Sequence, residues 1–357
     1  MIRARIAVAF LLGASFFGVD AQTPQPDGAG GPWSELKPMF EPVSNNAVAS
    51  LRRGRHTLLF TFMGMGPGKA WNAITNQAWM FDTESGNWTR LRSVPGLGRL
   101  AASAASVGGR IYVLGGYTVD AAGNEISVPN LDVYDPKKHL WRRGADIPVP
   151  VDDSVVGVYR DRYLFVVGGW SQKDNVRNVQ VYDTKKNSWS QATPLPGTPV
   201  FGHSGGLVGD TIVYVDGAYP NAQGGTPRYL AAEESWMGRI DGHDPARITW
   251  TRLPGHPGRS RYRMAAGVWG GRIIFSGGTD NPYNYNGVGY DGRPSEPVAA
   301  AFAWNLARSA WETLPDNPRP TMDHRGLLPT HEGLVALGGM EEGQRVTARV
   351  TQLVPAR

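Results

Sequence analysis

The stretch Ile111–Tyr117, IYVLGGY, decides the fold of this chain because it recurs along the sequence. Four strand-forming residues run into two glycines and an aromatic residue, and the same phrase returns as LFVVGGW at Leu164–Trp170. Related phrases begin at Met63 (MGMG), Val215 (VDGAY), Ser276 (SGGT) and Leu337 (LGGM). Glycine permits φ > 0, so the pair allows a tight turn where a side chain would clash. A strand and turn that recur in this way indicate an array of similar units.

A tryptophan marks each unit as well. The tryptophans that share a downstream pattern ending in proline lie 48 to 61 residues apart, at Trp33, Trp88, Trp141, Trp189, Trp250 and Trp311. An apolar residue followed by Asp or Asn stands between the glycines and the next tryptophan, at Asp82, Asp135, Asp183, Asp241 and Asn305. The pattern therefore predicts four short strands in each unit. The first of them carries small residues, as in RLAASAASV (99–107), which suits strands crowded around the central axis of a propeller.

The order of Gly-Gly, Tyr and Trp resembles the Kelch repeat over about residues 33–354. This resemblance implies an all-β fold, a six-bladed Kelch-type β-propeller. The segment that begins at Trp33 precedes any first strand, and the last unit ends without a tryptophan. We therefore expect the N-terminal strand to be the outer strand of the sixth blade and to close the ring, which protects an exposed sheet edge.

The N-terminus has the pattern of a secretory signal peptide. Arg3 and Arg5 precede an apolar run from Ile6 to Val19, and Val19-Asp20-Ala21 resembles a cleavage site. We expect a signal peptide at residues 1–21, a flexible leader at 22–32 and the propeller at 33–357. A membrane anchor is the alternative, although the apolar run is short for a span. The mature protein is then expected to be periplasmic or secreted, without a membrane span.

Composition excludes several classes of function. The chain has 46 Gly, 27 Pro and 12 Trp but no Cys, so disulfides and cysteine-ligated metal sites are excluded. The seven His lack short metal-binding spacings, and we expect neither a metal nor another cofactor. A formal net charge of +5 without a Lys or Arg cluster in the sequence gives no sign of nucleic-acid binding.

Polar residues recur just before each first strand of the repeat. They are Asn45, Asn46, Arg99, Asp152, Asp153, His203, Arg261, Tyr262, Arg263, Asp323, His324 and Arg325. Equivalent positions around a ring should converge on one opening, and convergent polar groups in a concavity indicate a ligand site. Hydration of the channel and bracing of the blades is the alternative. We expect Arg99, Arg261, Arg263 and Arg325, beside Asp152 and Asp153, to bind an anionic group through bidentate hydrogen bonds.

Two long connections follow the glycines in the fourth and fifth units, at residues 218–235 and 279–297. Long structured loops in compact domains are usually functional. The first contains Arg228, and the second contains Tyr283, Tyr285 and Tyr290 among asparagines and glycines. Aromatic rings can stack on sugar faces while amides pair with hydroxyls. These residues are therefore predicted to bind a carbohydrate.

The fifth-unit loop is similar to that of the bacterial N-acetylneuraminate epimerases, which are sugar mutarotases. That resemblance implies a catalytic Glu after the glycine of the second strand in blade four and an Arg six residues later; here Ala218 takes the place of the Glu and the nearest Arg is Arg228. Mutarotation needs one group to accept the anomeric hydroxyl proton and another to protonate the ring oxygen. The candidates are His203, His324, Glu233 and Glu234.

Two functions remain open at this point. The first is an exported protein that binds an acidic sugar at the mouth of the channel, with or without mutarotase activity. The second is a non-enzymatic module that binds a partner protein, for instance through acidic peptide side chains, because fold alone does not decide function.

Overall fold

The computed structural model describes residues 31–356. Within this range the regular structure is strand apart from two short 3₁₀ turns, η1 (Trp71–Ala73) and η2 (Glu342–Gln344). These residues contain no helix with the length and apolar character needed to span a membrane. The predicted signal peptide and residues 22–30 of the predicted leader lie outside the described residues.

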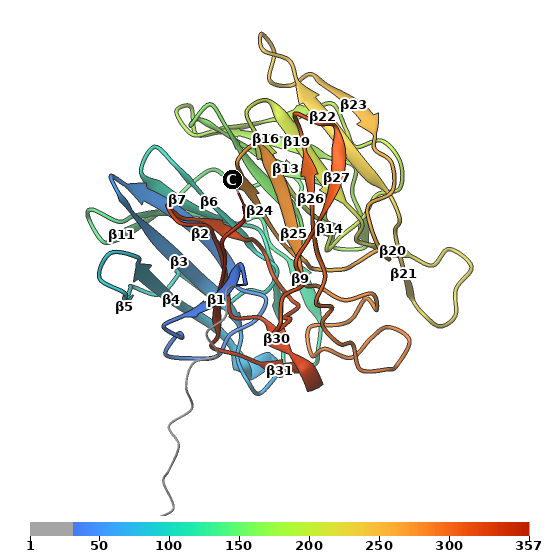
Figure 1. Cartoon of the computed structure of the whole chain (residues 1–357), viewed down its shortest axis with the longest axis horizontal. Helices are drawn as coiled ribbons and strands as arrows, with labels where there is room; N and C mark the ends of the chain where they lie inside the picture. Colours follow the sequence, from blue (N-terminus) through green and yellow to red (C-terminus); the bar gives the residue numbers. More distant parts are fainter. Residues whose placement is uncertain (1–30, 357) are drawn as a thin grey trace, which may run out of the picture. The chain divides into compact units, whose positions relative to one another are not determined.

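Six antiparallel four-stranded sheets follow one another along the chain as the blades of a propeller, coloured from blue to red in Figure 1. Blades 1 and 2 comprise β2 (Ala47–Arg53), β3 (His56–Met65), β4 (Ile74–Asp82) and β5 (Asn87–Arg90), then β6 (Ser103–Val107), β7 (Arg110–Leu114), β10 (Leu131–Asp135) and β11 (Leu140–Arg143). Blades 3 and 4 comprise β12 (Val155–Tyr159), β13 (Tyr163–Val167), β16 (Val179–Asp183) and β17 (Ser188–Ala192), then β18 (Ser204–Val208), β19 (Thr211–Val215), β22 (Ser235–Ile240) and β23 (Ile248–Arg252). Blades 5 and 6 comprise β24 (Ala265–Trp269), β25 (Arg272–Ser276), β26 (Ala301–Asn305) and β27 (Ala310–Leu314), then β28 (Leu328–Pro329), β29 (Leu334–Leu337), β32 (Val350–Leu353) and β1 (Trp33–Leu36). The predicted six-bladed all-β propeller is confirmed.

Small hairpins rise from one face of the ring, between the second and third strands of four blades (Figure 1). They are β8 (Tyr117–Val119) with β9 (Glu125–Ser127), β14 (Trp170–Ser171) with β15 (Asp174–Asn175), β20 (Ala218–Pro220) with β21 (Tyr229–Ala231), and β30 (Met340–Glu341) with β31 (Arg345–Val346). We call this side the mouth face. The opposite side, which carries the turns within each strand pair, is the back face.

The N-terminal strand closes the ring as predicted. β1 pairs with β32 from Trp33 opposite Leu353 to Leu36 opposite Val350, and Figure 1 shows the blue strand beside the red one. A hydrogen bond repeats at every junction: the indole N–H of each repeat tryptophan donates to the backbone carbonyl four residues after the tryptophan of the preceding blade. The six acceptors, from Trp33 to Trp311, are the carbonyls of Pro315, Lys37, Arg92, Ala145, Thr193 and Pro254.

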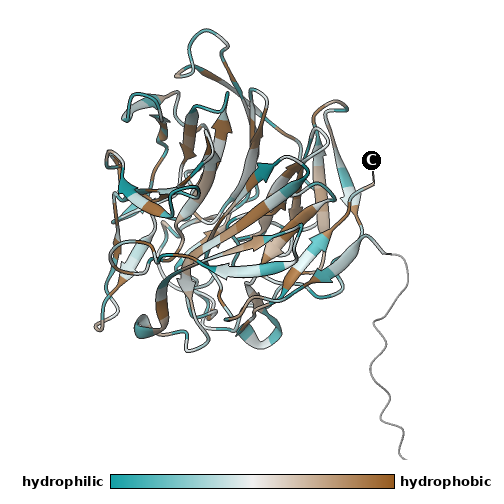
Figure 2. Cartoon of the chain, turned by 90° about the vertical axis from the view of Figure 1, so that its left-hand side faces the viewer, coloured by the Kyte–Doolittle hydropathy of each residue, from teal (hydrophilic) through white to brown (hydrophobic). Residues whose placement is uncertain are grey.

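Apolar side chains fill the space between blades, and Figure 2 shows brown segments along the strands with teal at many turns. At each glycine pair the chain leaves the end of the second strand and passes close to the backbone of the segment that precedes the first strand. A Cβ at Gly116, where φ is 86°, would lie 2.7 Å from the carbonyl oxygen of Leu100. In blade 4 the first glycine place is taken by Asp216, which adopts the same left-handed region with φ 61°.

A ring of left-handed residues surrounds the axis. In each blade, one residue of the segment that leads into the first strand has φ between 52° and 70°. These six residues are Asn45, Ala101, Asp153, Gly202, Arg263 and Asp323. Neighbours are joined by hydrogen bonds: the amide of Gly202 donates to the carbonyl of Asp153 (3.0 Å) and the amide of Arg263 to the carbonyl of Gly202 (2.8 Å). We call these six residues the inner ring.

A buried ion network crosses the inner ring. The Arg263 guanidinium contacts Asp153 Oδ2 at 2.6 Å and Asp323 Oδ1 at 3.0 Å, and Arg325 donates to the same Asp153. Although burial opposes ionisation, Arg263 and Arg325 lower the pKa of Asp153. Arg325 also faces a central cavity of about 270 Å³ lined by the first strands, whereas Asp153 and Arg263 face the mouth. The network therefore lies between the central cavity and the mouth.

Removing β1 should open the ring. Deletion through Phe40 removes four paired residues and the Trp33 indole hydrogen bond, whereas deletion through Gly31 leaves them in place. We expect the longer deletion to lower stability on the order of 4 kcal/mol, which lowers Tm by about 10 °C in calorimetry. Equal melting of the two truncated chains would contradict closure by β1.

Replacing Arg263 should destabilise the ring. Arg263→Ala leaves Asp153 and Asp323 buried without their main cation, and breaking a buried pair in this way costs about 3–5 kcal/mol. Urea unfolding measures the loss, with Arg293→Ala in an exposed part of the blade-five loop as the control, expected within about 0.5 kcal/mol of the parent. An Arg263→Ala protein as stable as the control would refute this role.

Candidate ligand site at the mouth

A pocket of about 380 Å³ opens on the mouth face over blades 2 to 4, and we call it the mouth pocket. Five of the predicted ligand-binding residues line it: Asp152, Asp153, Arg228, Arg263 and Tyr290. Its other walls are Tyr117, Gly123, Asn124, Glu125, Trp170, Gln172, Phe201, Tyr229 and Asn284. Polar groups and aromatic rings thus share one concavity, as in many small-molecule sites.

Strand geometry directs these side chains to the pocket. The residue after each glycine pair bridges back to the residue just before the inner ring, so Trp170 pairs with Asp152 and Ala218 with Phe201. The amide of Asp152 donates to the carbonyl of Trp170, and the amide of Trp170 donates to that of Asp152, both at 3.0 Å. The two bridged residues of each blade therefore lie next to each other at the mouth, beside the inner ring.

An aromatic wall lines one side of the pocket. The ring centroids of Trp170 and Phe201 are 5.6 Å apart, those of Phe201 and Tyr229 are 5.2 Å apart, and those of Tyr229 and Tyr290 are 4.4 Å apart. Mutual packing restrains these rings before any ligand binds. Rigid aromatic surface of this kind can bind a flat or ring-shaped ligand at a low entropic cost.

Two carboxyl groups of the pocket have raised pKa values. Burial and the negative charge of Asp153 raise the pKa of Asp152 well above its usual range, even though the hydroxyl of Ser127 donates to Asp152 Oδ2 at 2.6 Å. Glu125 lies two residues before Ser127 on β9, so it shares a strand face with Ser127. Desolvation by the surrounding protein raises the pKa of Glu125. Both groups therefore favour the neutral form more than an ordinary carboxyl does, and perturbed carboxyls that share a concavity are typical of functional sites.

Arg228 supplies a positive charge that internal ion pairs do not use. It directly precedes the hairpin strand β21, is exposed, and has its guanidinium 5.3 Å from the ring centroid of Tyr229. Within residues 31–356 it forms no ion pair, unlike Arg263 in the same pocket. Arg228 is thus the pocket arginine best able to bind an anionic group.

The blade-five loop covers the other half of the mouth. Tyr285 packs against the apolar cluster of Met65, Leu100 and Tyr117 from blades 1 and 2, and Gln344 of blade 6 donates to the carbonyl of Ser295 at 3.0 Å. The loop therefore crosses the mouth from blade 5 to blades 1 and 2, and its Asn284 and Tyr290 form one edge of the pocket. Of the three predicted tyrosines only Tyr290 lines the pocket; Tyr283 is completely buried, with its ring 5.3 Å from that of Tyr262.

Three predicted arginines do not line the mouth pocket. Arg99 is buried against Asp132 at 2.7 Å, and Arg261 donates to the carbonyl of Ala300 at 2.8 Å. Arg325 faces the central cavity. The expected convergence of strand-start residues on one opening therefore holds for Asp152, Asp153 and Arg263. It does not hold for these three arginines, which bond to Asp132, the Ala300 carbonyl and Asp153 from outside the pocket.

The predicted catalytic candidates also lie outside the mouth pocket. His203 and His324 line the central cavity, and burial lowers the pKa of each to about 4. Their Nε2 atoms contact the Val167 carbonyl at 2.9 Å and the Thr321 hydroxyl at 2.8 Å. Glu234 accepts a hydrogen bond from the Trp236 indole at 2.8 Å, and Glu233, one residue earlier, is exposed.

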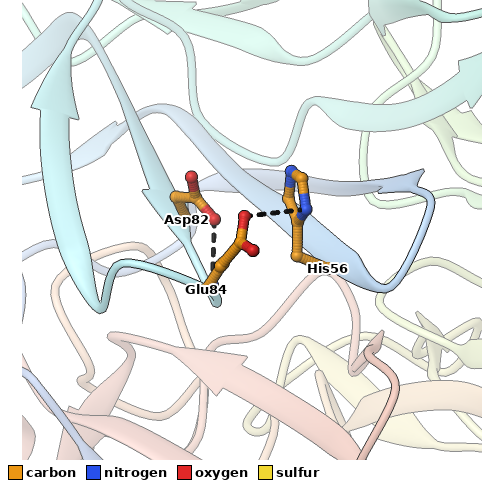
Figure 3. Close-up of side chains that lie close together, drawn as sticks. All are labelled: His56, Asp82 and Glu84. Atoms are coloured by element: carbon orange, nitrogen blue, oxygen red, sulfur yellow. Dashed lines mark hydrogen bonds and ion pairs between the residues drawn. The ribbon is translucent and has the colours of Figure 1, made fainter.

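A separate group of possible metal ligands lies at the back face. His56, Asp82 and Glu84 offer ligand atoms within 4.8 Å of one another (Figure 3). His56 Nδ1 lies 3.2 Å from Glu84 Oε2, and the Glu84 side chain is 73% exposed. An exposed ion pair at a turn accounts for this arrangement, and we assign it no metal.

The predicted site residues did not include the other nine walls of the pocket, among them Tyr117, Glu125, Trp170, Phe201 and Tyr229. A signal existed for two of them, since Tyr117 and Trp170 directly follow glycine pairs. Glu125 had none, because it lies in a hairpin whose position relative to the other blades depends on the ring.

Comparisons with known proteins agree with this architecture. Residues 32–217, slightly more than half of the chain, match the family model described as the KLHDC2/KLHL20/DRC7 Kelch-repeats domain. Beta-scruin of Limulus polyphemus is 27% identical over 146 residues, which cover 40% of this chain and 15% of beta-scruin. Kelch-like protein terF of Aspergillus terreus is 32% identical over 143 residues, 39% of this chain and 30% of terF. The chain thus spans only a minor part of these relatives.

A solved structure supports the same fold. The structure of YjhT superimposes with a TM-score of 0.70 over 89% of this chain and 96% of that one, at 18% sequence identity. Together with the family match and the six blades, these findings lead to one conclusion: the chain belongs to the Kelch-repeat family.

Proposed function

We propose that this protein is exported and binds an acidic carbohydrate in the mouth pocket. The observation that carries the proposal is the combination of an aromatic wall with polar groups in one concavity of about 380 Å³. The rings of Trp170, Tyr229 and Tyr290 offer apolar faces for a sugar ring. Asn124, Gln172 and Asn284 offer amides that can donate to and accept from hydroxyl groups.

Arg228 is the proposed partner of the ligand's acidic group. A guanidinium can hold a carboxylate through two parallel hydrogen bonds, and charge-assisted bonds are worth about 1.5–3 kcal/mol. Asp153 and Asp323 already compensate Arg263, so that residue supports the floor of the pocket instead. The N-terminal signal pattern supports export to the periplasm or the medium.

Proton transfer on the bound sugar is the enzymatic form of this proposal. In a mutarotation Glu125 as carboxylate accepts the anomeric hydroxyl proton, the C–O bond to the ring oxygen breaks as a carbonyl forms, and neutral Asp152 protonates that oxygen. Reclosure on the other face returns both protons. The raised pKa values of the two carboxyls and their common position in the pocket support these roles.

Protein binding is the competing function. Exposed apolar side chains on mouth-face connections favour it: Trp71 (47% exposed), Ile126 (51%) and Val288 (42%) come from blades 1, 2 and 5. An acidic peptide could then place a carboxylate at Arg228. The binding experiment below separates the two ligands.

Arg228→Ala should weaken the binding of acidic sugars at least tenfold, because one charge-assisted contact is lost. Calorimetric titration with N-acetylneuraminate, galacturonate and galactose measures this effect. Arg293→Ala, in an exposed part of the neighbouring loop outside the pocket, is the matched control and should bind like the parent. The proposal fails if neutral and acidic sugars bind equally, or if only an acidic peptide binds.

Glu125→Gln should separate binding from catalysis. The amide keeps the size of the side chain but cannot accept the proton, so anomer exchange should slow at least a hundredfold while affinity changes little. NMR exchange spectroscopy on the sugar that binds best measures the rate. An unchanged rate, or a parent protein that does not accelerate exchange, would leave a binding protein without this activity.

A further inference from the structure

The back face carries a concentration of positive charge that the linear sequence does not reveal. Propeller topology brings to this face every turn between first and second strands and every turn between third and fourth strands. In blades 1 to 3 these turns and the strand ends beside them hold eight cations that form no ion pair with any described residue: Arg52, Arg53, Arg55, Lys137, Lys138, Arg160, Lys185 and Lys186. All eight are exposed. We call this surface the basic patch.

Acidic residues at the same turns neutralise only part of this positive charge, and several of them contact other groups first. Asp183 binds Arg162 at 2.5 Å, and Asp161 accepts the backbone amide of Gly108 at 2.9 Å. Glu84 pairs with His56, as Figure 3 shows. Ten cations lie at these turns, the eight of the basic patch with Arg110 and Arg162, against the five acidic residues Asp82, Glu84, Asp135, Asp161 and Asp183. The turns of blades 1 to 3 therefore keep a net charge of 10 − 5 = +5, which gives a positive potential over three neighbouring blades.

The remaining blades show a different pattern. On the back face of blades 4 and 5 the cations lie among acidic residues: Arg239 pairs with Asp210 at 2.9 Å, Arg308 pairs with Glu312 at 3.2 Å, and Arg247 shares its turn with Asp241 and Asp244. The positive charge is thus confined to blades 1 to 3. A general solubility role would not require such an uneven distribution.

We propose that the basic patch binds an anionic lipid surface. The cations occupy turn tips on one face of a ring, an arrangement that suits a planar partner. Leu140, 48% exposed, lies two residues from Lys138 and can enter the interface between headgroups and acyl chains. A lysine or arginine near an anionic membrane contributes affinity that falls with salt, and several together give stable attachment.

This proposal does not depend on the mouth pocket. The mouth face and the back face lie on opposite sides of the ring, so a protein attached through the basic patch would present its pocket away from the lipid. Ligand binding and membrane attachment can therefore be tested, and can fail, separately.

Vesicle co-sedimentation of the purified protein tests the proposal. We expect binding to vesicles of equal parts phosphatidylcholine and phosphatidylglycerol, little binding to phosphatidylcholine alone, and release as salt shortens the screening length. The Lys137→Glu/Lys138→Glu variant should weaken binding about tenfold, and adding Lys185→Glu/Lys186→Glu about a hundredfold. Sugar binding in the mouth pocket should not change.

The matched control reverses two lysines of the mouth face, Lys69→Glu and Lys173→Glu, which alters net charge equally and leaves the N-terminal segment unchanged. It should bind vesicles like the parent, and circular dichroism verifies that each variant is folded. Equal loss in this control would show a response to net charge alone and overturn the proposal. Equal binding to neutral vesicles, or binding only to a soluble polyanion such as dextran sulfate, would do so too.

Discussion

Ring closure is the constraint on which the rest of this structure depends. The indole N–H of each of the six repeat tryptophans donates to the carbonyl four residues beyond the tryptophan of the preceding blade. The series returns to its start where Trp33 binds Pro315. A buried indole prefers a hydrogen-bond partner, so this contact fixes both the packing of a large ring and the offset between neighbouring sheets. Because β1 completes the sixth blade, neither end of the array exposes an open edge there.

A second feature, the inner ring, stabilises the structure around the axis. Six left-handed residues bring one backbone turn from each blade into the inner ring, and a left-handed conformation costs a non-glycine residue about 1–2 kcal/mol. Hydrogen bonds between neighbours and the ion network of Asp153, Arg263 and Asp323 offset that cost. Strained backbone that is over-determined by its surroundings often supports a functional site, and here it forms the floor of the mouth pocket.

The two faces of the ring are chemically different because different connections reach them. Long connections on the mouth face cover blades unequally, so the blade-five loop fills one side while short hairpins leave a pocket over blades 2 to 4. In blades 1 to 3 only short turns reach the back face, and their exposed tips collect lysine and arginine. A binding pocket and a charged surface can thus coexist without sharing residues.

The sequence alone determined the repeat, the number of blades and the closing strand, since glycine pairs and tryptophans report local backbone and packing needs that every blade repeats. It also located Asp152, Asp153, Arg228, Arg263 and Tyr290 near one opening. Tertiary structure decided which polar groups are free: Arg99 and Arg261 meet acceptors from other segments, and Tyr283 is buried by its own loop. It also placed Glu125 in the same pocket as Asp152, and gathered the basic patch from separate turns. Periodicity encodes what repeats within a blade, whereas contacts between blades depend on how the ring closes in space.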